Sequence, residues 1–140
     1  DLQIFPSQMK GAVGMLRDFP GTTFVLNHAG MLDARDDESI AVWRAGMEAL
    51  SACPNLVVKF TGLGTFDHKS SPEIMKPMIP VSLELFGASR CMYGSNFPIE
   101  KLWTSYATYF DNVVQAVGPV SDADRHEIFY GTANRVYRLD

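Results

Sequence analysis

The sequence is poor in cysteine, with only Cys53 and Cys91 in 140 residues and no pair at CxxC spacing. This scarcity excludes a disulfide framework and the common cysteine-based zinc sites. Both thiols stand among apolar residues, where a cysteine typically serves as a small buried hydrophobic side chain. We therefore expect a reducing, cytoplasmic setting.

Long apolar runs and an excess of positive charge are also missing. No apolar stretch approaches the roughly 20 residues that a membrane-spanning helix needs. The chain carries 12 Lys and Arg against 16 Asp and Glu, for a net charge of −4, whereas nucleic-acid surfaces are basic. A hydrophobic content of 46% predicts a soluble globular domain. We expect a small-molecule substrate and neither a nucleic acid nor a membrane as partner.

A glycine-rich phosphate loop is absent as well. Gly62-Leu63-Gly64 lacks the fuller glycine pattern and the helix that would open directly after it. The first residue is Asp1 rather than Met, and it leads straight into the apolar stretch 2–5. We therefore expect processing, truncation or an incomplete reading frame.

What the chain does contain is an alternation of short apolar runs with longer helical patterns. The apolar runs predict four strands, at about residues 2–5, 22–28, 56–61 and 90–94. Ser7 is the expected cap of a first helix, and Gly87 is the expected stop of a short helix in the middle of the chain. The spacing of Ser121 and Asp124 is typical of a capping box at the start of a later helix.

Strands that alternate with helices predict a parallel sheet, because parallel neighbours need a crossover connection. The strands are continuously apolar, as expected where both faces of a sheet are covered. Two architectures fit this order, an open doubly wound sheet and part of a closed barrel, and composition does not choose between them. We expect four parallel strands with helices on one side of a curved sheet.

Sites in both architectures form at the carboxyl ends of the strands, where His28, Lys59 and Asn96 stand. A neutral imidazole there can bind a metal or accept a proton, although His28 can equally be a structural histidine. Lys59 lies in an apolar strand and needs either a partner for its ammonium or a path to solvent. His68 and His126 have charged neighbours and are expected at the surface.

Five blocks of residues follow one another through nearly the whole chain. They are Phe24–Gly30, Trp43 with Gly46-Met47, Pro54–Leu63, Phe86-Gly87 with Arg90–Pro98, and Ala133–Leu139. In this order they resemble blocks of the amidohydrolase-related (amidohydrolase 2) family of TIM-barrel metal-dependent hydrolases. This family includes lactonases that act on sugar lactones and pyrone dicarboxylates, with decarboxylases as relatives.

The resemblance implies that residues 1–140 are one partial domain, the last four β/α units of a (β/α)8 TIM barrel. It makes His28 a catalytic residue and a ligand of a divalent metal, zinc before others, with metal-independent chemistry as the alternative. Lys59 is the candidate to hold a substrate carboxylate. Asn96 stands where many members carry the aspartate that activates water, and an amide cannot accept that proton. An aspartate at this position is expected to restore a base.

The resemblance also implies that part of the active site is missing. The family's His-x-His pair on the first barrel strand has no counterpart in this sequence. A complete barrel takes roughly 250 residues, so this chain supplies about half of one. We expect a hydrolase of lactones or similar carbonyl compounds when the barrel is complete. A decarboxylase of the same barrel and an inactive half-barrel fragment are the alternatives. The open sheet should pair with the missing N-terminal half or self-associate.

Overall fold

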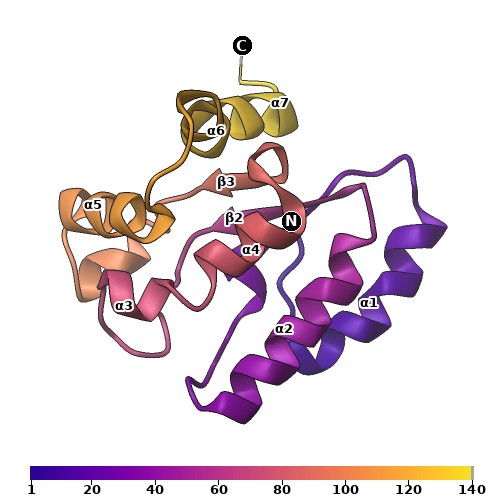
Figure 1. Ribbon diagram of the computed structural model, residues 1–140, viewed down its shortest axis with the longest axis horizontal. Helices are drawn as coiled ribbons and strands as arrows, with labels where there is room; N and C mark the ends of the chain where they lie inside the picture. The colour runs from indigo at the N-terminus through magenta and orange to yellow at the C-terminus, as the bar shows by residue number, and fades with distance from the viewer. Residues whose placement is uncertain (140) are drawn as a thin grey trace.

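The computed structural model describes residues 1–139, and a parallel three-stranded sheet lies at its centre (Figure 1). The strands are β1 (Phe24–Leu26), β2 (Leu56–Phe60) and β3 (Cys91–Tyr93). β2 is the central strand, and β1 and β3 pair with it on its two sides. The parallel direction predicted from the sequence is confirmed.

Helices connect and flank these strands. Figure 1 shows α1 and α2 side by side below the sheet, and α6 and α7 beyond β3 on the other side. The α-helices are α1 (Pro6–Asp18), α2 (Asp37–Ser51), α3 (Pro72–Met75), α4 (Ile79–Phe86), α5 (Tyr106–Val117), α6 (Asp122–His126) and α7 (Thr132–Tyr137). The short helical turns are η1 (Asn27–Gly30), η2 (Ala88–Arg90), η3 (Ile99–Leu102) and η4 (Glu127–Gly131), the last a π-helical turn between α6 and α7.

Several helix ends follow directly from the sequence. Asp36 caps α2 by accepting a hydrogen bond from the Ser39 amide at 2.9 Å. Gly87 ends α4 with a φ of +72°, a conformation that costs glycine little. Ser121 caps α6 through the Asp124 amide. The prediction for Gly87 is confirmed. Of the predicted capping box, the Ser121 cap is confirmed, whereas the Asp124 carboxylate accepts from the Ser121 hydroxyl and not from its backbone amide.

The predicted cap of the first helix is wrong. α1 begins at Pro6 with Phe5 as its N-cap, and Ser7 lies inside the first turn. Proline suits the first helical position because its missing N–H has no partner to lose there. The Gln8 side chain, at the third helical position, accepts a hydrogen bond from the Phe5 amide at 2.9 Å and so satisfies the backbone donor of the N-cap residue.

The predicted first strand at 2–5 is also wrong. The sheet has three strands, whereas four complete β/α units would contribute four. Only Leu2 pairs with β1, as an isolated parallel bridge to Leu26. The Leu2 amide donates to the Val25 carbonyl at 2.6 Å, and the Asn27 amide donates to the Leu2 carbonyl at 2.8 Å. The chain then turns away, because α1 begins at Pro6 before a second ladder step can form.

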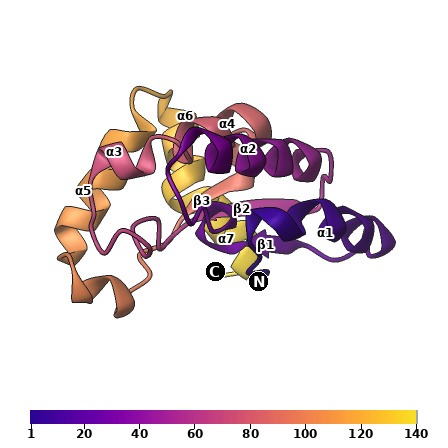
Figure 2. The ribbon, with the colours of Figure 1, turned by 90° about the horizontal axis from the view of Figure 1, so that it is seen from below.

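The two faces of the sheet are both covered. Leu26, Val58 and Phe60 belong to the main core, which the helices α1, α2, α4 and α5 complete. Val25, Val57 and Met92 point to the opposite face, where α7 packs on them. Figure 2 shows the strands between α2 and α7. The prediction of helices on one side is therefore wrong, since alternate strand residues are apolar on both faces and each face needs a cover.

None of the helices in residues 1–139 combines the length and the apolar character that crossing a bilayer requires.

Candidate active site at the carboxyl ends of the strands

A hollow of about 300 Å3 lies where the three strands end. It brings together the three site residues predicted from the sequence, although the roles of those residues stay predictions. A larger hollow of about 580 Å3 lies beside Arg90 and Arg135 at the amino ends of the strands, where barrels of this kind do not build active sites. The lining of the smaller hollow is Asn27, His28, Lys59, Thr61, Gly94 and Asn96.

The imidazole of His28 is oriented by the neighbouring strand end. Its Nδ1 lies 2.9 Å from the carbonyl oxygen of Thr61. A carbonyl can only accept, so Nδ1 must carry the proton and donate it. The lone pair is then on Nε2, which is the form of histidine that binds a metal or takes up a proton. His28 has a φ of +56°, in the left-handed region that only a few per cent of non-glycine residues occupy.

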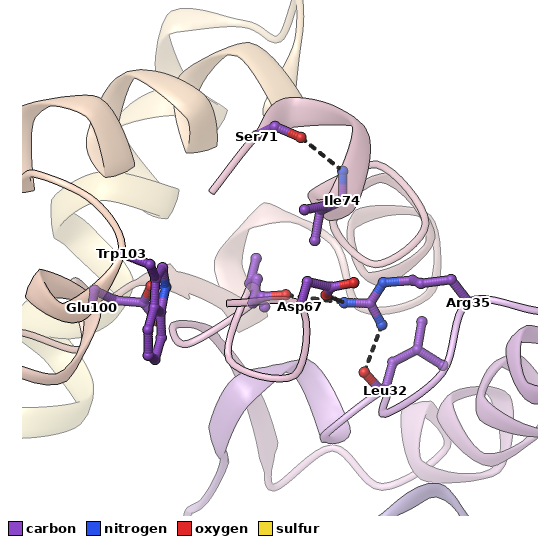
Figure 3. A network of polar contacts seen from close by, with 8 residues as sticks. Leu32, Arg35, Asp67, Ser71, Ile74, Glu100 and Trp103 are labelled. Carbon is purple, nitrogen blue, oxygen red and sulfur yellow. Dashed lines mark hydrogen bonds and ion pairs between the residues drawn. The ribbon is translucent and has the colours of Figure 1, made fainter. Parts of the chain in front are cut away.

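One buried contact and one half-buried ion pair hold the loops that follow β1 and β2. The Trp43 indole N–H donates to the carbonyl oxygen of Ala29 at 2.8 Å, directly after His28. The Arg35 guanidinium donates to the Leu32 carbonyl at 2.6 Å and pairs with Asp67 at 2.8 Å (Figure 3). Helix α2 and this ion pair therefore fix the backbone on which the imidazole depends.

Gly62 is the point on which the two site side chains converge. A Cβ atom at this position would lie 2.5 Å from Nδ1 of His28 and 3.0 Å from Nδ2 of Asn96. The φ of Gly62 is +60°, which a side chain would also resist. Glycine is thus required here both by its backbone conformation and by the close approach of the imidazole and the amide.

The Asn96 side chain donates a hydrogen bond to a buried carboxylate that sequence reasoning missed. The side chain of Glu100, in η3, is fully buried. Its Oε1 accepts from Asn96 Nδ2 at 3.2 Å, and its Oε2 accepts from the Trp103 indole N–H at 2.5 Å. Figure 3 shows Glu100 and Trp103 next to each other. Burial, followed by the charge of Glu100, raises the pKa of Tyr109 well above its ordinary value.

The Lys59 ammonium contacts the carboxylate of Asp1 and the phenol of Tyr137. Its Nζ lies 2.7 Å from Oδ2 of Asp1 and 2.9 Å from the Tyr137 hydroxyl, and its side chain is 18% exposed. The Tyr137 hydroxyl also donates to Oδ1 of Asp1 at 3.0 Å. Of the two alternatives for this lysine, a partnered ammonium is confirmed. The contact demonstrates that a carboxylate fits against Nζ at the edge of the hollow.

Asn27 adds an acceptor that sequence reasoning did not single out. Its Oδ1 is buried and accepts no hydrogen bond from the described part of the chain, yet the residue lines the hollow. The signal available in the sequence was its position next to His28 at a strand end.

The remaining histidines lie outside the hollow, as predicted. His68 is exposed and stacks on Trp103 with ring centroids 5.4 Å apart, and His126 is exposed beside Tyr130.

Comparison with known proteins identifies the family. The sequence profile described as amidohydrolase matches residues 1–139. The chain belongs to the amidohydrolase family. This confirms the resemblance found in the five sequence blocks.

Curated relatives match this chain along nearly all of its length. The uncharacterized protein y4mH of Sinorhizobium fredii is 32% identical over 139 residues, which are 99% of this chain and 46% of that protein. The L-fucono-1,5-lactonase of Burkholderia multivorans is 31% identical over 150 residues, covering 99% of this chain and 51% of the lactonase. This amidohydrolase chain therefore spans about half the length of the curated relatives it matches.

Solved amidohydrolase structures show the same fold. A crystal structure of an amidohydrolase from Burkholderia multivorans with bound Zn superposes with a TM-score of 0.91 at 30% identity, covering 100% of this chain and 52% of that one. The α/β arrangement of this chain is therefore similar to about half of an amidohydrolase structure.

Proposed function

We propose that this chain forms one half of a hydrolase site that opens a lactone or a similar cyclic ester, and that the site is complete when the other half of the barrel is present. The observation that carries the proposal is the convergence of His28, Lys59 and Asn96 in one hollow at the carboxyl ends of the strands. The lactonase names among its relatives support a lactone over other carbonyl substrates.

The side chains of the hollow suit such a substrate. Nε2 of His28 has a free lone pair, because Nδ1 donates to Thr61, and can take a proton from an attacking water. The Lys59 ammonium supplies a positive charge for a carboxylate or for a polarised carbonyl oxygen.

A divalent metal fits this chain only in part. His28 offers one imidazole, whereas a catalytic zinc takes three protein ligands. No group of three or more His, Cys, Asp or Glu side chains in residues 1–139 is arranged to hold a metal ion. We therefore propose His28 as one ligand of a zinc centre when a metal is bound, in which case the Nε2 lone pair would hold the ion instead of taking a proton, and we derive no chemical step through a metal from this chain alone. We also propose a reducing, cytoplasmic setting, which the buried free thiols of Cys53 and Cys91 support.

The test joins this chain to the N-terminal half of the Burkholderia multivorans lactonase, with the lactonase itself as the positive control. Ring opening adds water across the ester and releases a carboxylic acid, so a pH indicator follows the hydrolysis of L-fucono-1,5-lactone. We expect turnover above the spontaneous rate from the joined protein and none from the 140-residue chain. A folded joined protein without turnover would reject lactone hydrolysis, and hydrolysis by the chain alone would reject the shared site.

A further inference from the structure

The carboxylate of Glu100 is buried without a cation. It is fully enclosed, and no lysine, arginine or histidine of residues 1–139 forms an ion pair with it. A buried charge is costly unless hydrogen-bond donors replace the water that it has lost. The donors here are the indole N–H of Trp103 at 2.5 Å and Nδ2 of Asn96 at 3.2 Å.

The hydrogen bond to Glu100 determines the orientation of the Asn96 amide. Nδ2 of Asn96 donates to Oε1 of Glu100, so the NH2 group of the amide faces Glu100 and the oxygen faces away. Oδ1 of Asn96 accepts no hydrogen bond from the described residues and is not an enclosed atom, and the residue lines the hollow. The hollow therefore receives the acceptor end of the amide.

We propose that Glu100 is a positioning residue that holds the Asn96 amide with Oδ1 toward the hollow, so that this strand end presents a neutral acceptor to a ligand hydroxyl or to water. A carboxylate behind the amide also polarises it, which makes Oδ1 a stronger acceptor. The assignment rests on the proposed function only for the identity of the ligand. The geometry of the pair stands without it.

The pair also changes the expectation for an aspartate at position 96. Asn96→Asp would place a second carboxylate where Nδ2 now lies 3.2 Å from Oε1 of Glu100. Two carboxylates at such a distance cannot both ionise without a large cost. The single substitution should therefore weaken the fold and not simply supply a base.

Exchanging the two groups should relieve that conflict. In the double variant Asn96→Asp with Glu100→Gln, the glutamine can donate to the aspartate through its NH2 group and accept from Trp103 through its oxygen. The single variant Glu100→Gln keeps the Trp103 bond but turns a donor toward Asn96, so the Asn96 amide must rotate and present NH2 to the hollow.

The experiment is a double-substitution cycle on the 140-residue chain, with urea unfolding and 15N–1H spectra and no substrate. We expect Asn96→Asp to lower the unfolding midpoint and the double variant to recover most of the loss. In wild type the Asn96 NH2 protons should exchange slowly with solvent, and in Glu100→Gln they should exchange fast while Trp103 N–H stays protected. Glu84→Gln, which removes an exposed ion pair with Arg44, should leave the exchange of the Asn96 NH2 and Trp103 N–H protons unchanged.

Additive losses in the cycle, or a fast-exchanging Asn96 amide in wild type, would overturn the assignment. If a Glu100 variant does not fold, Trp103→Phe replaces it, because removing the indole donor should leave the Asn96 amide protected. Loss of lactone turnover in the joined protein with these signals intact would reject the proposed function and leave the role of Glu100 standing.

Discussion

Nδ1 of His28 donates a hydrogen bond to the carbonyl oxygen of Thr61, 2.9 Å away at the end of the neighbouring strand. This contact links β1 to β2 beyond the last rung of the sheet ladder. It also leaves the lone pair of the ring on Nε2. The same hydrogen bond therefore holds the two strand ends together and determines which nitrogen can act in the hollow.

Replacing His28 should separate the chemical role from the structural one. We expect His28→Ala to lower lactone turnover by ~10²-fold or more in the joined protein, because it removes the only imidazole of the hollow. The pH-indicator assay measures the rate. His126→Ala, an exposed substitution on α6, is the control and should leave turnover unchanged. Equal turnover in wild type and His28→Ala would return His28 to a structural role.

Gly62 should tolerate no side chain. At its φ of +60°, the left-handed backbone costs any non-glycine residue ~1–2 kcal/mol. A Cβ atom here would also lie 2.5 Å from Nδ1 of His28. Gly14→Ala, inside α1, is the control, since its φ is not positive and nothing lies within 4 Å of its Cβ. We expect Gly62→Ala to lower the urea midpoint and Gly14→Ala to leave it unchanged or raise it, because alanine favours a helix more than glycine does. An unchanged midpoint in Gly62→Ala would contradict the close packing around Gly62.

Much of the fold was predictable because its signals are local. The apolar runs of β1, β2 and β3 and the stop at Gly87 depend on a few neighbouring residues, and the parallel direction follows from the helices between the strands. The first strand was predicted wrongly because an apolar run does not reveal how many of its residues find a partner. Leu2 alone pairs with β1 before α1 begins at Pro6.

The site was predictable as far as strand ends identify it. His28, Lys59 and Asn96 each follow an apolar run, and the hollow gathers all three. Glu100 was missed because, beside the charged Lys101, it has the sequence character of a surface residue. Only the tertiary fold encloses it against Trp103.

Lys59 and Asp1 should respond to substitution in opposite directions. Lys59→Met should weaken binding of L-fuconate, the ring-opened product, in the joined protein, whereas Asp1→Asn should strengthen it by freeing the ammonium. The stability change should stay within ~1 kcal/mol, because the Asp1 side chain is 40% exposed. Titration calorimetry measures the binding, and the exposed Lys101→Met is the control. Unchanged binding in both variants would exclude Lys59 from ligand contact.

The isolated chain should self-associate. Leu2 is the only residue of 1–139 that pairs with the outer edge of β1, which leaves backbone groups open to another strand. Ile99 and Leu102 in η3 and Tyr106 in α5 are also exposed, at 51%, 77% and 53%, and offer apolar side chains to a second copy. We expect sedimentation to give an average mass above the 15.5 kDa of one chain and rising with concentration.

Leu102→Glu should shift the distribution toward the monomer. Leu139→Glu is the control, because that leucine is also exposed, at 66%, but follows α7. A monomer at every concentration would contradict the prediction.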